Sequence, residues 1–174
     1  GYCGTIVGAE GAIFRTEDVG RKWVRQESGV RFLLHGVSFA SEGSGIVVGE
    51  GGRVLNTSNG GETWIQQNSG SSSFLLSVDF VTPSLAIAVG YIGEILTSQD
   101  GGVTWSHRES GVFGPLNGVS FLNEMEGTVV GWGGEILHTL AGGGTWEKQL
   151  SGTTNSLFGV SYIVGGGCTA VGLY

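Results

Sequence analysis

The stretch SQDGGVTW, residues 98–105, gathers residue types that could do chemistry into a very short space. The carboxylate of Asp100 could bind a metal ion or a sugar hydroxyl, and the indole of Trp105 could stack on a ligand. The adjacent glycines are equally typical of a tight turn. Which of the two this stretch forms depends on the elements that position it.

The same stretch recurs along the chain at a constant interval of 41 residues. Tryptophan closes it each time, at Trp23, Trp64, Trp105 and Trp146. The same step links Phe39, Phe80, Phe121 and Tyr162, and no insertion interrupts either series. A fixed period of this size indicates a tandem repeat.

Each repeat predicts four short strands, as in residues 33–40, 45–50, 52–58 and 63–68. The segments alternate apolar and small or polar residues, and glycine interrupts every window in which a helical period of 3.6 could develop. Four strands in about 40–45 residues are typical of a β-propeller blade. We therefore predict one all-β propeller domain over residues 1–174, built of four-stranded antiparallel blades. The repeats run over about 1–26 (partial), 27–67, 68–108, 109–149 and 150–174 (partial), or about four blades in a ring or in part of a larger propeller.

The pattern Ser/Thr-x-Asp-x-Gly-x-Thr-Trp resembles the Asp-box, or BNR repeat, of sialidases and many other propellers. The whole unit, with GVSF, then VVG, then G-x-ILxTxDGGxTW, is more similar to the propeller of the photosystem II stability and assembly factors and their bacterial relatives. This resemblance implies that the Asp-box is the hairpin between the third and fourth strands of a blade.

The copies of the Asp-box differ in a way that favours a structural role. Asp18 and Asp100 keep the acid, Asn59 replaces it with an amide and Ala141 lacks a polar side chain, while all four tryptophans remain. A catalytic acid or a metal ligand would not vary so freely between copies. We interpret the acid as the acceptor that closes the turn and the tryptophan as packing between blades.

The composition argues against several function classes. The chain has 35 glycines, only 13% charged residues and a net charge of −7, so a nucleic-acid partner is not expected. No apolar run approaches the roughly 18 residues of a membrane span. The three histidines occupy different repeat positions, and the arginines do not recur at one position as a sialidase would need. We predict no enzyme, catalytic residue, cofactor or metal, and keep a sialidase-like hydrolase as a remote alternative.

Positions that break the repeat are the candidates for binding. Propeller topology places the turns after the second strands and the blade-to-blade loops on one face. Residues that would gather there are Arg31, Glu50, Tyr91, Phe113 and Trp132. Exposed aromatic groups beside charges suit a protein or glycan partner; the alternative is that these are unconstrained loop residues. In the resembled assembly factors an arginine-rich patch marks the functional surface, and no such cluster occurs here.

The two ends of the chain duplicate one strand of the repeat. Residues 5–8 and 169–172 both correspond to a second strand. Three explanations are open: a segment of a longer propeller, a four-bladed ring with one end displaced, or terminal strands that complete a neighbouring chain's blade. Cys3 and Cys168 would then form a terminal staple, a bond between chains, or simply two small side chains.

These observations lead to one main hypothesis and one rival. The first is a non-catalytic, extracytoplasmic propeller that acts as a scaffold or assembly protein and self-associates into oligomers or a fibre through its terminal strands. The extracytoplasmic location is an expectation from a sequence that begins without Met, as a processed chain would. The rival is a module that binds protein or glycan through the exposed aromatic turns.

Overall fold

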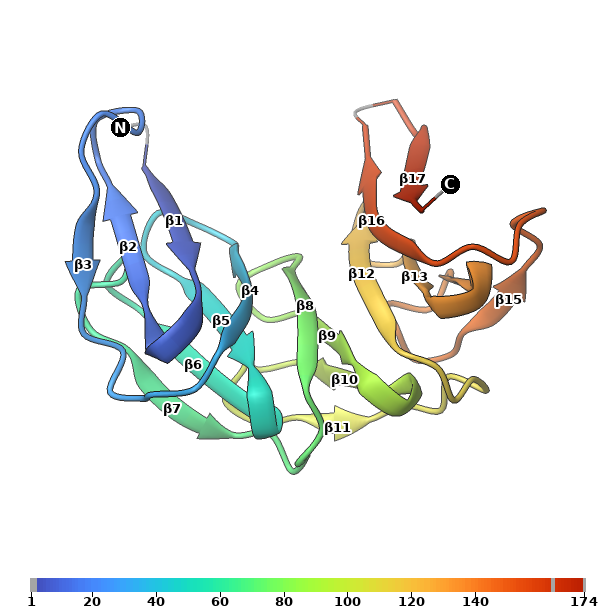
Figure 1. Cartoon of the computed structure of the whole chain (residues 1–174), viewed down its shortest axis with the longest axis horizontal. Helices are drawn as coiled ribbons and strands as arrows, with labels where there is room; N and C mark the ends of the chain where they lie inside the picture. Colours follow the sequence, from blue (N-terminus) through green and yellow to red (C-terminus); the bar gives the residue numbers. More distant parts are fainter. Residues whose placement is uncertain (1–2, 164, 174) are drawn as a thin grey trace.

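The computed structural model describes residues 3–163 and 165–173, and it arranges strands β1 to β17 in five antiparallel sheets along an open arc (Figure 1). We number the sheets as blades 1 to 5 in chain order. Blade 1 contains β1 (Gly4–Val7), β2 (Ile13–Thr16) and β3 (Val24–Gln26). Blade 2 contains β4 (Leu34–Phe39), β5 (Gly45–Gly49), β6 (Arg53–Thr57) and β7 (Ile65–Asn68). Blade 3 contains β8 (Leu75–Phe80), β9 (Ala86–Gly90), β10 (Ile95–Ser98) and β11 (Ser106–His107). Blade 4 contains β12 (Leu116–Phe121), β13 (Gly127–Gly131), β14 (Ile136–Thr139) and β15 (Glu147–Gln149), and blade 5 contains β16 (Leu157–Tyr162) and β17 (Cys168–Gly172).

Blades 2, 3 and 4 share one topology, in which the four strands pair in chain order. Their register repeats as well: Phe39 faces Gly45, Phe80 faces Ala86 and Phe121 faces Gly127 at the same end of the first pair. The predicted all-β architecture of four-stranded antiparallel blades is confirmed.

The apolar core lies between blades. Every residue of β5, β9 and β13 is buried, because each of these second strands is covered on both sides. One cluster joins Ile46 and Val48 of blade 2 to Leu75 and Leu96 of blade 3. A blade therefore buries its apolar surface on its neighbours, as repeat proteins do.

Two kinds of side-chain hydrogen bond recur between neighbouring blades. In the first, a side-chain oxygen on the first strand accepts from a backbone N–H on the next first strand: Ser38 from Phe80 (3.0 Å), Asp79 from Phe121 (2.7 Å) and Ser120 from Tyr162 (3.3 Å). In the second, a side chain on β2, β6 or β10, the third strands of the repeat, donates to a glycine carbonyl in the next Asp-box: Arg15 to Gly60, Asn56 to Gly101 (2.7 Å) and Thr97 to Gly143 (3.5 Å). These bonds fix the register of one blade on the next.

A three-residue 3-10 turn follows β1, β5, β9 and β13, the second strands of the repeat. These turns are η1 (Ala9–Gly11), η2 (Glu50–Gly52), η3 (Tyr91–Gly93) and η4 (Trp132–Gly134). Its middle residue has a left-handed conformation, as in Gly51 with φ 63° and ψ 32°. The last residue of the turn donates its backbone N–H to the following loop, as Gly52 does to the carbonyl of Ser73 at 2.6 Å.

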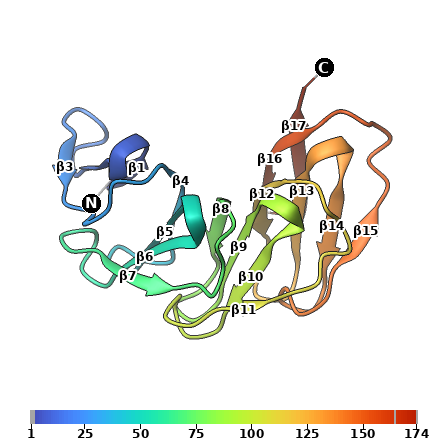
Figure 2. The same ribbon diagram turned by 60° about the horizontal axis from the view of Figure 1, so that its bottom comes forward.

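The two terminal sheets do not pair with each other, so the described residues form an arc and not the four-bladed ring considered above (Figures 1 and 2). Strands β1 and β17 occupy separate sheets and do not compete for one place. Cys3 and Cys168 are both free thiols, and both are exposed. A staple between them is therefore not formed within this structure.

Asp79 supplies a test of the bonds between first strands. Burial raises the pKa of its carboxyl group, against the opposing effect of the hydrogen bond from Phe121. Folding therefore favours the protonated acid, and this contribution to stability is lost as the pH rises from the ordinary value of 3.8 through the folded pKa. Asp79→Ser installs the residue that blades 2 and 4 carry at this position, Ser38 and Ser120. Urea unfolding over a pH series should show a smaller loss of stability toward neutral pH in this variant than in the wild type.

The matched control is Asp79→Ala, which leaves the N–H of Phe121 without its acceptor. It should lower the free energy of unfolding by about 1–3 kcal/mol. Equal destabilisation by serine and alanine would show that the hydrogen bond does not hold the blades together.

Candidate functional site

The two ends of the blades carry different kinds of residue. The Asp-boxes and the hairpins between first and second strands lie at one end, where Gly60 N–H donates to the carbonyl of Gly43 (2.8 Å). The 3-10 turns and the blade-to-blade loops lie at the other, where Gly93 N–H donates to the carbonyl of Gly114 (2.9 Å). We call the second end the turn face.

The side chain of Asp100 is fully engaged in the Asp-box turn. Its Oδ1 accepts from the backbone N–H groups of Val103 (3.1 Å) and Thr104 (2.9 Å) and from the Ser98 hydroxyl (2.8 Å), while its Oδ2 accepts from the Thr104 hydroxyl (2.6 Å). These bonds, those from Thr104 first, lower the pKa of Asp100. A backbone N–H from Lys22 lowers the pKa of Asp18 in the same way. The carboxylate thus has a turn-closing role that needs no ligand.

The variant copies keep the turn through a hydroxyl group that the sequence reasoning overlooked. Asn59 Oδ1 still accepts from Thr63 N–H (3.0 Å), but Ala141 has no acceptor. In that copy the buried Thr139 hydroxyl accepts from the N–H groups of Ala141 (3.0 Å) and Gly143 (3.2 Å). All four copies have this buried hydroxyl, at Thr16, Thr57, Ser98 and Thr139. The signal was present as the Ser/Thr that opens the motif.

The tryptophans of the Asp-boxes pack on the blades. Trp105 contacts the cluster between blades 2 and 3, and its Nε1 donates to the carbonyl of Gly102 (2.9 Å). The rings of Trp64 and Trp146 meet Phe39 and Phe121 edge to face, with centroids 6.1 Å apart in both pairs. Trp23, on blade 1, is the more exposed copy.

The aromatic candidates lie on the turn face with their rings open to solvent. Phe113 is 90% exposed, Trp132 63% and Tyr91 45%. Tyr91 meets Phe74 edge to face at 5.6 Å, and the Trp132 ring packs over Gly114, where an added Cβ would lie 3.1 Å from it. We refer to Phe74, Tyr91, Phe113 and Trp132 as the aromatic row.

The charged candidates lie nearer the N-terminal end of the arc. Glu50 is partly buried and accepts from the N–H of Leu33 (3.4 Å), while Arg31 is exposed. Arg53, which the sequence reasoning did not select, stacks on Phe32 at 4.2 Å. Phe32 and Phe74 were also missed, although both are aromatic only in their own copy of the repeat and could have been found by that departure.

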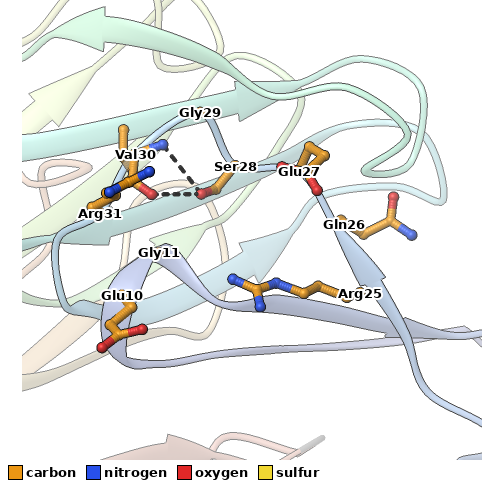
Figure 3. A pocket seen from close by; sticks show the side chains of 9 residues that line it. All are labelled: Glu10, Gly11, Arg25, Gln26, Glu27, Ser28, Gly29, Val30 and Arg31. Atoms are coloured by element: carbon orange, nitrogen blue, oxygen red, sulfur yellow. Dashed lines mark hydrogen bonds between the residues drawn. The ribbon is translucent and has the colours of Figure 1, made fainter.

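A hollow of one kind recurs on the turn face, between a 3-10 turn and the loop that follows the same blade. It measures about 740 Å³ beside blade 1, about 300 Å³ beside blade 3 and about 550 Å³ beside blade 4. A paired glutamate lines each of the last two: Glu94 contacts His107 (2.7 Å), and Glu135 forms an ion pair with Lys148 (2.8 Å). Blade 1 has Ala12 at the repeat position of Glu94 and Glu135. There the guanidinium of Arg25 points toward the turn that carries Glu10 (Figure 3).

Among residues 3–163 and 165–173, no three His, Cys, Asp or Glu side chains gather closely enough to hold a metal ion. In the same ranges, no helix is long and apolar enough to cross a membrane.

Comparisons with known proteins agree with this architecture. The family model described as photosynthesis system II assembly factor YCF48 (PSII_BNR) matches residues 68–164, which is more than half of the chain. Among solved structures, YCF48 bound to a D1 peptide is 20% identical with a TM-score of 0.76, and the match covers 98% of this chain and 57% of that one. YCF48 from Cyanidioschyzon merolae is 19% identical with a TM-score of 0.71, covering 92% and 56%. An ancestral GH74 enzyme is 13% identical with a TM-score of 0.66, covering 92% and 27%.

This chain therefore spans somewhat more than half the length of the YCF48 structures that it matches. A comparison with curated protein sequences found no match.

The turn-closing role of the Asp-box acid can be tested by removing the acid from one copy and adding it to another. Asp100→Ala removes four hydrogen bonds and should cost about 0.5–2 kcal/mol of stability, a loss similar to that of a helix N-cap. Because the pKa of Asp100 is lowered by folding, the wild type should lose this contribution as the pH falls through the folded pKa, and the variant should not. Urea unfolding at neutral and acid pH measures both effects.

The complementary variant is Ala141→Asp, which restores the acid in the copy that lacks it. Its carboxylate can accept from the N–H of Thr145, the residue that corresponds to Thr104, so stability should rise. A neutral effect in both variants would contradict the turn-closing role.

Proposed function

The chain belongs to the photosynthesis system II assembly factor YCF48 family, and from that premise we propose that it is a non-catalytic propeller module that binds a segment of a protein partner on its turn face. The observation that carries this proposal is the aromatic row, which leaves large apolar side chains exposed on the turns and loops of one face. Aromatic anchors of this kind dominate the binding energy of protein interfaces. A YCF48 structure bound to a D1 peptide supports a peptide as the form of ligand.

The backbone under the aromatic row is rigid, which favours binding. The N–H of Tyr91 donates to the carbonyl of Phe74 (2.9 Å), and the N–H of Trp132 donates to the carbonyl of Pro115 (2.8 Å). Ser73 Oγ adds a bond to the carbonyl of Tyr91 (3.0 Å). A partner would meet side chains already held in place, so little ordering entropy is lost on binding.

The polar groups beside Tyr91 argue for a peptide over a glycan. Both carboxylate oxygens of Glu94 are occupied, one by His107 (2.7 Å) and the other by the Ser71 hydroxyl (3.1 Å). A sugar needs hydrogen-bonding groups to spare beside an aromatic platform, whereas an apolar side chain does not.

Trp132→Ala and Phe113→Ala test the proposed face. Random peptides displayed as a library and a synthetic D1 peptide serve as probes, and affinities are measured by fluorescence anisotropy. Each substitution should weaken binding of the enriched peptides by about 2 kcal/mol or more. Because both side chains are largely exposed, stability should change by less than about 0.5 kcal/mol.

Met125→Ala is the matched control. Met125 is 56% exposed and lies in a hairpin at the Asp-box end, so its loss should leave affinity unchanged. Enrichment of peptides that bind the aromatic variants equally well would overturn the proposal. Binding to a glycan array, or hydrolysis of a fluorogenic sialoside, would favour the alternatives.

A second part of the proposal is head-to-tail association of copies. In blade 5, Ser161 occupies the acceptor position of Ser38, and in blade 4, His138 occupies the donor position of Asn56. At the other end, the Phe39 N–H and the Val19 carbonyl occupy the matching donor and acceptor positions. These groups are the two halves of the joint that the bonds between consecutive blades, from blade 1 to blade 5 of one chain, already form. The proposal places the protein outside the cytoplasm, where Cys3 and Cys168 near these halves could be oxidised.

Light scattering coupled to size-exclusion chromatography tests this association. We expect a mass that rises with concentration, and a fraction held by disulfides that a reducing gel releases. Ser161→Ala with His138→Ala should shift the chain toward monomer, because these changes remove the acceptor and the donor side chains of the joint. A chain that stays monomeric at every concentration, with both thiols free, would rule the association out.

A further inference from the structure

Ile92 has a backbone conformation that its side chain disfavours. It lies at φ 62° and ψ 33° in the middle of the 3-10 turn Tyr91–Gly93. The corresponding residues of blades 2 and 4 are Gly51 and Gly133, with φ 63° and 70°. A β-branched residue in the left-handed region is an outlier, since its Cβ crowds the backbone. Glycine would fill the same turn without this penalty, and the repeat uses it twice.

The side chain of Ile92 contributes little to the fold in return. It is 71% exposed, and the turn is held by backbone bonds that any residue could make. The N–H of Gly93 donates to the carbonyl of Gly114 (2.9 Å), and the N–H of Glu94 donates to that of Tyr91 (3.1 Å). Backbone outliers that make no compensating contact within the fold cluster at functional sites.

Ile92 lies at the rim of the hollow beside blade 3. Phe113 lines the same hollow, which measures about 300 Å³, and Glu94 and His107, 2.7 Å apart, line it as well. Arg108 and Glu109 line it too, and the Nε of Arg108 is buried without a hydrogen-bond partner among the described residues. The exposed apolar side chains of this hollow are Ile92 and Phe113. Tyr91, adjacent to Ile92, continues this apolar surface into the aromatic row.

The other two hollows are chemically different. The hollow beside blade 4 has Gly133 at the position of Ile92 and is lined by Glu135 and Lys148. The hollow beside blade 1 has Glu10 there, again in the left-handed region (φ 55°), and is lined by Arg25 and Arg31. Only blade 3, of these three, combines an aliphatic turn residue with an aromatic loop residue.

We propose that the hollow beside blade 3 receives one aliphatic or aromatic side chain of the bound peptide, and that Ile92 selects for it. This inference rests on the proposed function, because it assigns a pocket within the same face. Ile92 and Phe113 both line this hollow and are both exposed, so a side chain bound there would cover apolar surface of both. In this proposal, contact of the Ile92 side chain with the bound peptide is the reason that a strained isoleucine occupies this turn.

Ile92→Gly separates the two roles of this residue. Relief of the left-handed strain should raise the Tm by about 2–8 °C. Loss of the apolar wall should weaken binding of the peptides enriched on the wild-type chain by about ten- to hundredfold. Thermal unfolding and fluorescence anisotropy on the same preparations give both readouts, and a more stable protein that binds more weakly is the expected signature.

Val19→Gly is the matched control for strain. Val19 has φ 65°, is 71% exposed and lies in an Asp-box, at the other end of its blade, where the other copies carry Gly60, Gly101 and Gly142. Its replacement should raise the Tm similarly and leave peptide affinity unchanged. Ile92→Ala removes the side chain but keeps a Cβ, so it should weaken binding without the gain in Tm.

The outcomes distinguish this inference from the proposed function. If Ile92→Gly and Ile92→Ala bind the peptides as the wild type does, while Trp132→Ala does not, the pocket is wrong and the face stands. If affinity falls in Ile92→Gly but not in Ile92→Ala, the loss comes from the backbone and the side-chain role is overturned. If Trp132→Ala and Phe113→Ala also leave affinity unchanged, the proposed function itself fails.

Discussion

The contact between one blade and the next determines this structure, because a blade cannot bury its own apolar surface. A four-stranded sheet has two faces, and the second strands β5, β9 and β13 are buried on both. Burial alone would allow neighbouring sheets to slide on each other. The bonds of Ser38, Asp79 and Ser120 to the next first strand, and of Arg15 and Asn56 to the next Asp-box, remove that freedom.

This joint leaves the two ends of the blades free to serve different purposes. At the Asp-box end, polar side chains are engaged within the turn itself, as the four bonds of Asp100 to two backbone N–H groups and two hydroxyl groups show. At the turn face, the backbone satisfies itself through bonds such as that of Gly93 to Gly114, so the side chains are released for contact with a partner. The same backbone can therefore present a tryptophan at one turn and a glutamate at another, as Trp132 and Glu50 do, without a change of fold.

The sequence predicted the repeating parts of this fold well, because the signals repeated with them. The spacing of Trp23, Trp64, Trp105 and Trp146 located the strands, and Asp100 with its glycines located a turn. What the sequence did not reveal depends on neighbours in space. The 3-10 turn at Tyr91–Gly93 is held by a carbonyl in the next loop. The position of the Phe74 ring depends on its packing on Tyr91, and the environment of Asp79 depends on the adjacent blade. The conformation of Ile92 was hidden because an isoleucine gives no sign of a left-handed backbone.

The bonds between blades also limit the distances over which this chain must find its own contacts while folding. They join residues 42, 45 or 46 positions apart, which is about one repeat. Most all-β folds pair strands from distant parts of the sequence and fold slowly for that reason. Here the loops to be closed are short and equal, so a nucleus can form at any pair of adjacent blades and grow by one blade at a time. Blades 2 and 3, joined by the cluster around Leu75, give such a nucleus a ready core, and the sheets of blades 1 and 5 would dock last.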